Sequence, residues 1–249
     1  MKKHTSRLLS FLLVLALLCS VFTVSASETK DVSALPEYIQ GADTSAVKEF
    51  KLSSAEALTA LASDIKPDDG NGTYSMAGVT FYLANDIELS GSFTPISNVT
   101  YPADAFAGTF DGNGHSITGL SINSSSTGGV GLFGFVNGGT IQNLRVEGTI
   151  NSSQSQFVGG IVGKTQGTVK ITNCSFSGSI TSSKSGSSAA AGGILGRVNS
   201  GSPEIRNCAN FADITSTGGL AAGIAGYIAR ASITIENCYN AGKIKALWY

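Results

Sequence analysis

One sequence pattern recurs four times in the second half of the chain. Each copy contains glycine, two apolar residues and glycine, and an asparagine follows a little over ten residues later. These asparagines are Asn143, Asn173, Asn207 and Asn237, so the spacing is 30, 34 and 30 residues. A fixed period of this size is typical of stacked supersecondary units, none of which can bury its own apolar face alone. The sequence therefore predicts one elongated repeat domain.

Apolar and polar residues alternate after each of these asparagines. Three of the four columns formed by every second residue are small or apolar, as expected for a strand with one buried face. The second column ends in Asn210 and Asn240, so either these amides are buried and bonded to each other or the strand has already bent there. The four sets are Leu144, Val146, Gly148 and Ile150; Cys174, Phe176, Gly178 and Ile180; Cys208, Asn210, Ala212 and Ile214; and Cys238, Asn240, Gly242 and Ile244.

Opposite charges align between the third and fourth copies on the other parity. Arg206 aligns with Glu236, and Asp213 aligns with Lys243, which is the pattern expected of neighbouring strands. The repeated asparagines fit the same geometry, either as a ladder of bonded amides or as residues that tolerate a left-handed corner. These features predict an all-β parallel β-helix, a solenoid in which successive repeats stack in register.

Cysteines occupy one slot in three consecutive repeats, at Cys174, Cys208 and Cys238. Side chains stacked in a parallel sheet point in the same direction, which disfavours a disulfide. We therefore expect a ladder of buried thiols, with a disulfide between two of them as the alternative. The extra residues of the longest repeat fall largely in the Ser/Gly/Ala-rich stretch 181–191, which is either a binding loop or a neutral insertion.

The chain begins with the features of a secretory signal. A positive start precedes an apolar run over residues 8–24, and small residues allow cleavage after Ala26. The run is short for a membrane span, which is the alternative. Without residues 1–26 the chain keeps 13 Lys and Arg against 17 Asp and Glu, a net charge of −4. This balance argues against nucleic-acid binding, and we expect no membrane insertion of the mature chain.

Three further segments organise the rest of the chain. Residues 27–52 form a polar lead-in for which we expect loose structure, and the β-helix domain is placed at 53–249 with full repeats from about 128. Ser53 to Glu56 has the form of a capping box, and the apolar spacing that follows predicts a short amphipathic helix over 53–66 that caps the stack. The alternation over 79–89 predicts one strand.

No catalytic, cofactor-binding or metal-binding residue emerges from the repeats. The carboxylates Glu147, Glu204, Asp213 and Glu236 are scattered, and a polysaccharide lyase or glycosidase needs them grouped. His115 is the only histidine beyond the signal segment, so a His-based triad would depend on it alone. The acidic loops 68–72 and 111–113 lack the ligand spacing of a calcium site.

Two aromatic residues face outward in neighbouring repeats, at Phe211 and Tyr239. Exposed aromatics of this kind are typical of sugar-binding surfaces. The alternative is that they pack against a loop.

The segments "GLFGFVNGGTIQNLRVEGTI", "VGGIVGKTQGTVKITNCSFSGSI" and "AGGILGRVNSGSPEIRNCANFADI" resemble the GLUG-motif repeats of bacterial secreted and surface proteins, as do "FYLANDIELSG" and "FAGTFDGNGHSITGLSI". The resemblance covers roughly residues 53–245. It implies a right-handed parallel β-helix that serves as a stalk or display module of large adhesin-like, cell-wall-associated proteins. It supplies no catalytic residue.

We therefore expect a secreted or cell-wall-associated, non-enzymatic surface module without cofactors, whose partners are host or cell-wall glycans or surface proteins. A carbohydrate-binding or polysaccharide-degrading β-helix is the alternative. The sequence stops directly after a repeat, and Leu247, Trp248 and Tyr249 are candidates for a small apolar lid. Whether it is a fragment of a longer repeat protein stays open.

Overall fold

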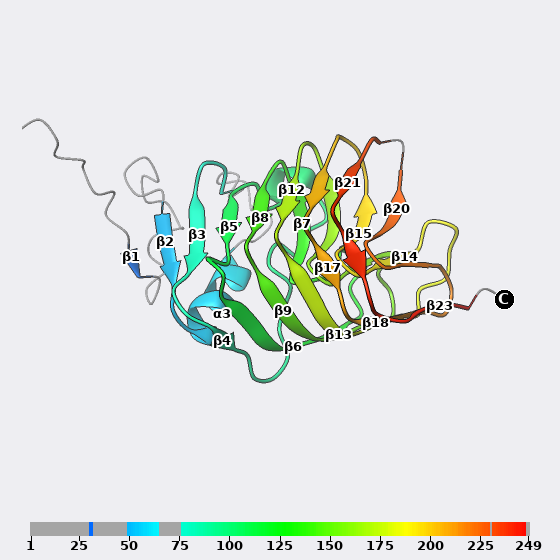
Figure 1. Cartoon of the computed structure of the whole chain (residues 1–249), viewed down its shortest axis with the longest axis horizontal. Coiled ribbons are helices and arrows are strands. Elements are labelled where there is room, and N and C mark those ends of the chain that lie inside the picture. Colours follow the sequence, from blue (N-terminus) through cyan, green and yellow to red (C-terminus); the bar gives the residue numbers. More distant parts are fainter. Residues whose placement is uncertain (1–29, 32–48, 65–75, 230, 248–249) are drawn as a thin grey trace, which may run out of the picture.

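The chain forms an all-β parallel solenoid (Figure 1). The computed structural model describes residues 30–31, 49–64, 76–229 and 231–247. The predicted signal segment 1–26 and the acidic loop 68–72 lie outside these residues. All strand pairs within the described residues run parallel, and each strand pairs with its counterpart in the next coil. The predicted parallel stacking of successive repeats is confirmed.

Four sheets run along the solenoid. Sheet A contains β1 (Lys30–Asp31), β2 (Glu49–Leu52), β3 (Thr80–Leu83), β5 (Thr109–Asp111), β8 (Thr140–Gln142), β12 (Lys170–Thr172), β16 (Glu204–Arg206) and β21 (Thr234–Glu236). Sheet B contains β4 (Ile87–Glu88), β6 (Ser116–Ser124), β9 (Arg145–Ser152), β13 (Ser175–Ser182), β17 (Ala209–Asn210), β18 (Asp213–Ser216), β22 (Tyr239–Asn240) and β23 (Ile244–Ala246). Sheet C contains β7 (Phe133–Asn137), β11 (Val162–Gln166), β15 (Leu195–Val198) and β20 (Ala225–Ile228). Sheet D contains β10 (Phe157–Gly159), β14 (Ala190–Gly192) and β19 (Leu220–Ala222).

The core is a set of apolar columns that run along the stacking axis. In-register isoleucines line sheet A at Ile141, Ile171 and Ile205, all fully buried. In the N-terminal half the columns are aromatic, and the ring centroids of Phe106 and Phe133 lie 5.1 Å apart. Because each coil lies on its neighbours, stability in such a fold is a nearest-neighbour sum.

The repeated glycine segments connect sheet D to sheet C. At Gly160 a Cβ atom would overlap the carbonyl oxygen of Gly193 in the next coil and the ring of Phe176 across the core. The same position in the next coil, Gly193, faces the carbonyl oxygen of Gly223. Glycine is therefore required there because the backbones of adjacent coils and the core side chains leave no room for a side chain.

A short helix, α3 (Ala55–Asp64), begins the stack. It follows β2 as β4 follows β3, so it takes the position that strands of sheet B occupy in later coils (Figure 1). Its predicted apolar stripe, including Leu58 and Leu61, is buried in the core. The helix thus shields this end of the apolar stack from solvent.

The predicted capping box is wrong by one residue. The amide of Ala57 donates to Ser54 Oγ at 3.2 Å, which makes Ser54 the N-cap rather than Ser53. Glu56 then lies one position too early to return a bond to the cap residue's amide. Hydrogen bonds from its own amide and from the Ser54 hydroxyl instead lower the pKa of Glu56.

Two segments differ from the sequence-based expectation. β2 pairs in register with β3 and buries Phe50 and Leu52, so sheet A extends into the predicted lead-in 27–52. The single strand expected over 79–89 is two strands, β3 and β4, in different sheets. The backbone bends at 84–86, where the Asn85 amide donates to Ser53 O at 3.2 Å.

The four repeated asparagines form both structures that the sequence allowed. Each lies in the left-handed region, with φ between 53° and 55°. Each side-chain amide also donates to the asparagine of the preceding coil, at 2.9 Å from Asn173 to Asn143 and 3.0 Å from Asn207 to Asn173. Asp111 begins the ladder by accepting from Asn143 at 3.0 Å. These asparagines therefore define one corner of every repeat, between sheets A and B.

Substitutions of Asn173 separate its two roles. We expect Asn173→Gly to lower the free energy of unfolding by about 1 kcal/mol, because it removes the ladder bonds and keeps the favourable backbone. Asn173→Ala should cost about 2 kcal/mol, since alanine also disfavours a positive φ. Urea unfolding followed by circular dichroism measures both. Equal losses for the two variants would contradict the left-handed contribution.

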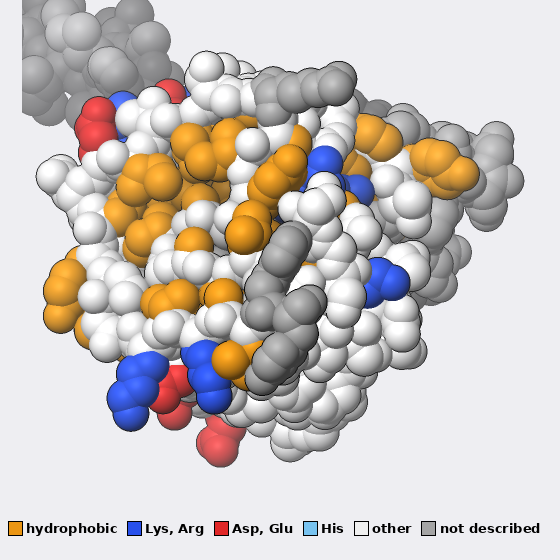
Figure 2. All heavy atoms as spheres, turned by 90° about the vertical axis from the view of Figure 1, so that its right-hand side faces the viewer, with side chains coloured by type: hydrophobic (Ala, Val, Ile, Leu, Met, Phe, Trp, Pro, Cys, Tyr) orange, Lys and Arg blue, Asp and Glu red, His pale blue; other side chains and the backbone are white. Residues whose placement is uncertain are grey.

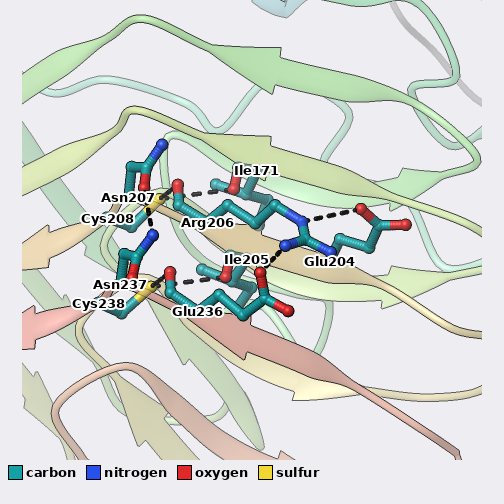
Figure 3. A network of polar contacts seen from close by, with 9 residues as sticks. All are labelled: Ile171, Glu204, Ile205, Arg206, Asn207, Cys208, Glu236, Asn237 and Cys238. Carbon is teal, nitrogen blue, oxygen red and sulfur yellow. Dashed lines mark hydrogen bonds and ion pairs between the residues drawn. The ribbon is translucent and has the colours of Figure 1, made fainter.

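The cysteines are free thiols in one column, and the structure contains no disulfide within the described residues. Cys174 and Cys208 are buried, and Cys238 in the last coil is half-buried. Each sulfur contacts a backbone carbonyl of the preceding coil, at 3.6 Å for Cys174 and Ile141 and 3.5 Å for Cys208 and Ile171 (Figure 3). The predicted thiol ladder is confirmed.

Most of the length difference between repeats lies in one loop, as predicted. Ser182 lies 30 residues after its partner Ser152, whereas Ala190 lies 33 residues after its partner Phe157. Three extra residues therefore fall between β13 and β14. The rest of the coil keeps its register.

Candidate functional site

The predicted catalytic candidates do not form a catalytic group. Arg206 pairs with Glu204 at 3.2 Å and with Glu236 of the next coil (Figure 3). The predicted Arg206–Glu236 pair is confirmed. Asp213 accepts a hydrogen bond from the backbone amide of Lys243 at 2.9 Å, so this contact uses the main chain. These carboxylates serve contacts between coils.

The remaining candidates are dispersed. Glu147 is exposed on sheet B, away from the acidic pair on sheet A. His115 Nδ1 lies 3.5 Å from Asp86 Oδ1, but no serine hydroxyl among the described residues bonds to its ring. Asp86 also accepts from the Ser116 amide at 2.7 Å, and this bond lowers the pKa of Asp86. Within the described ranges, no group of three His, Cys, Asp or Glu side chains could hold a metal ion.

An exposed aromatic pair is the most distinctive feature on the outer face of sheet B. Phe211 and Tyr239 come from adjacent coils, and their side chains are 51% and 59% exposed. Their ring centroids lie 6.1 Å apart in an edge-to-face arrangement. The two rings pack on each other and remain open to solvent.

Asn210 creates this display. Its buried side chain donates to Ala212 O at 3.0 Å and accepts from Ala212 N at 3.2 Å, so it takes the place of a strand partner. This interrupts the strand between β17 and β18, whereas β13 is continuous in the preceding coil. Asn210 also donates to Asn240 Oδ1 at 2.7 Å. Both readings of the polar column are thus correct, since the amides bond along the stack and the strand breaks there.

A polar groove lies at the opposite end of sheet B, and the sequence gave no indication of it. Its volume is about 350 Å³. The Asn151 side chain donates to Asn123 Oδ1 at 3.0 Å and continues a polar ladder along one side. The groove is lined by amides and hydroxyls of three coils, namely Asn123, Ser124, Ser125, Asn151, Ser152, Ser153, Thr181 and Ser183.

The C-terminal end of the stack differs from the helix-capped end. Figure 2 views the solenoid from this side, where apolar side chains gather on the surface. They include Leu220, Ile228, Ile235 and Ile244 of the last coil, each about two-fifths exposed. Of the proposed lid, Trp248 and Tyr249 lie outside the described residues. Exposed strand edges and apolar side chains make this coil the one expected to open most readily.

No helix among the described residues is long and apolar enough to cross a membrane.

Comparisons with known proteins agree with the repeat pattern. A family model described as the GLUG motif matches residues 158–181, which is nearly one coil from β10 to β13. The predicted resemblance to GLUG-motif repeats is confirmed there. Halomucin of Haloquadratum walsbyi is 37% identical over 109 residues. That match covers 43% of this chain and about 1% of halomucin.

A solved structure of a candidate immunoglobulin A1 protease from Bacteroides ovatus is also similar. It is 16% identical, with a TM-score of 0.39, and the match covers 80% of this chain and 83% of that one.

Proposed function

We propose that the chain is a non-enzymatic module of the extracellular surface, a display scaffold built from stacked GLUG-type repeats that coil in the right-handed sense. The observation that carries the proposal is the continuous in-register stacking of sheets A and B through every repeat. Such stacking produces a stiff rod whose outer side chains are free to present contacts. The matched segment of halomucin supports it, because that unit occurs within a far larger protein.

Secretion and hydrolysis assays test this proposal. We expect the full chain, carrying a C-terminal epitope tag in a bacterial secretion host, to leave the cytoplasm with an N-terminus that starts at Ser27. We expect no release of reducing ends or unsaturated uronides from plant, bacterial and mucin polysaccharides. Retention of the intact chain in the cytoplasm would contradict the surface location. Sugar release by the purified protein would favour the polysaccharide-degrading alternative.

The exposed aromatic pair supports a second candidate function, carbohydrate binding. Sugar rings stack on exposed aromatic faces, and Phe211 and Tyr239 offer two such faces on neighbouring coils. Glycans recovered from an array screen of the full chain should bind Phe211→Ala and Tyr239→Ala about tenfold more weakly, a loss of about 1.4 kcal/mol. Tyr101→Ala is the matched control, since Tyr101 is 69% exposed elsewhere. Equal binding by all variants would exclude the pair as the sugar site.

A further inference from the structure

Two cationic side chains are direct neighbours on the outer face of sheet C. Lys164 of β11 and Arg197 of β15 are register partners, with Phe135 before them and Tyr227 after them in the same column. Neighbouring strands lie about 4.8 Å apart. Like charges placed opposite each other in a sheet are destabilising, so the column needs a compensating interaction.

The described residues do not provide an anionic partner. No carboxylate among them forms an ion pair with Lys164 or Arg197. Lys164 is only 8% exposed, and Nζ has one long hydrogen bond, 3.4 Å to Thr100 O. Arg197 Nε is buried without a partner among the described residues. Burial and the positive charge of Arg197 lower the pKa of Lys164, which reflects the cost of placing two cations together.

Aromatic rings compensate for part of this cost. Lys164 Nζ lies 3.8 Å from the Phe135 ring centroid, and Arg197 Cζ lies 4.6 Å and 5.3 Å from those of Phe157 and Tyr227. Cation–π contacts of this kind contribute about 0.5–2 kcal/mol each. They do not neutralise the charges, and the hydrogen-bonding capacity of the guanidinium is still unused by the described residues. An anion would satisfy both.

The surrounding chain leaves access from one side. The segment that carries the 3-10 helix η1 (Pro102–Asp104) covers Phe135 with Val99 and Ala105. Its cover reaches Lys164 through the Thr100 carbonyl. Arg197 and Tyr227, one and two coils further along, are partly exposed. The cations therefore lie at the edge of a ledge, with aromatic rings beside them.

We propose that Lys164 and Arg197 form a binding site for a sugar that carries a carboxylate, such as a uronic acid residue of an acidic glycan. The guanidinium fork suits a planar carboxylate, and the ammonium adds a second donor. Tyr227 and Phe157 offer apolar faces to the sugar ring. This site is separate from Phe211 and Tyr239 on sheet B, and it does not depend on the display role.

Titration calorimetry on the full chain tests the site. The probes are trigalacturonate, neutral galactotriose and sodium sulfate at matched ionic strength, and the variants are Arg197→Gln and Lys164→Met. We expect the wild type to bind trigalacturonate, with at least tenfold weaker binding of galactotriose and sulfate. Both variants should lose at least tenfold in affinity for trigalacturonate. Arg206→Gln is the matched control on sheet A and should bind like the wild type.

Thermal unfolding of the same variants separates binding from folding. Loss of the like-charge neighbour should leave the Tm of Lys164→Met equal to or above that of the wild type, while its binding is lost. The proposal is overturned if the wild type shows no binding of millimolar trigalacturonate, or if both variants bind it unchanged. Equal affinity for sulfate would overturn the sugar assignment.

Discussion

Gly160→Ala is expected to lower the free energy of unfolding by more than about 3 kcal/mol, the largest effect of any single methyl group added to this fold. The new Cβ would overlap the Gly193 carbonyl oxygen and the Phe176 ring. Backbone of the next coil lies on one side and a buried ring on the other, so neither can yield without disturbing the stack. Overpacking usually costs 1–3 kcal/mol and more where the backbone must move.

Gly128→Ala provides the matched control for this experiment. A Cβ there would lie 3.0 Å from Asn98 Oδ1 and 3.4 Å from Ser126 Oγ. Both are ends of side chains that can rotate away, so we expect a change below about 1 kcal/mol. Urea unfolding of both variants gives the comparison. If Gly160→Ala were as stable as Gly128→Ala, the close approach of adjacent coils would not be a constraint on the fold.

Phe133→Ala should destabilise the protein by about 3–5 kcal/mol, the range for removing a fully buried phenylalanine. Phe133 lies where two aromatic contacts meet, 5.1 Å from Phe106 and 5.3 Å from Phe110 between ring centroids. It is completely buried, so the cavity would lose contacts on several sides.

Phe211→Ala removes the same side chain from an exposed position. We expect it to change stability by less than about 1 kcal/mol, because most of that ring is already in contact with water. Chemical denaturation with a common m-value is the measurement. Similar losses for Phe133→Ala and Phe211→Ala would show that the aromatic columns do not hold the coils together.

The periodic features were the most predictable part of this protein. Stacking in register makes each strand position a column, so the alternation after each asparagine and the alignment of Arg206 with Glu236 could be read directly from the spacing. Boundaries were less predictable. The helix cap moved from Ser53 to Ser54 because the cap depends on which hydroxyl faces the first free amides, and both serines have the required chemistry.

The candidate binding residues were predictable only in part. Phe211 and Tyr239 followed from parity, but their exposure depends on the way Asn210 bonds to Ala212. Lys164 and Arg197 each lie four residues after the first glycine of their repeat, so alignment on the glycines would have placed them together. The signal was missed because outward charges were compared only around the asparagines.

The sequence by itself determined the parallel stacking, the period and the asparagine and cysteine columns, because a repeated unit that stacks on its copies brings identical positions together. Only the tertiary structure decided why the repeated glycines are required, where the coils bend and which side chains lack partners. Those properties depend on the distance between backbones of adjacent coils and on chain segments far apart in the sequence, such as Thr100 beside Lys164.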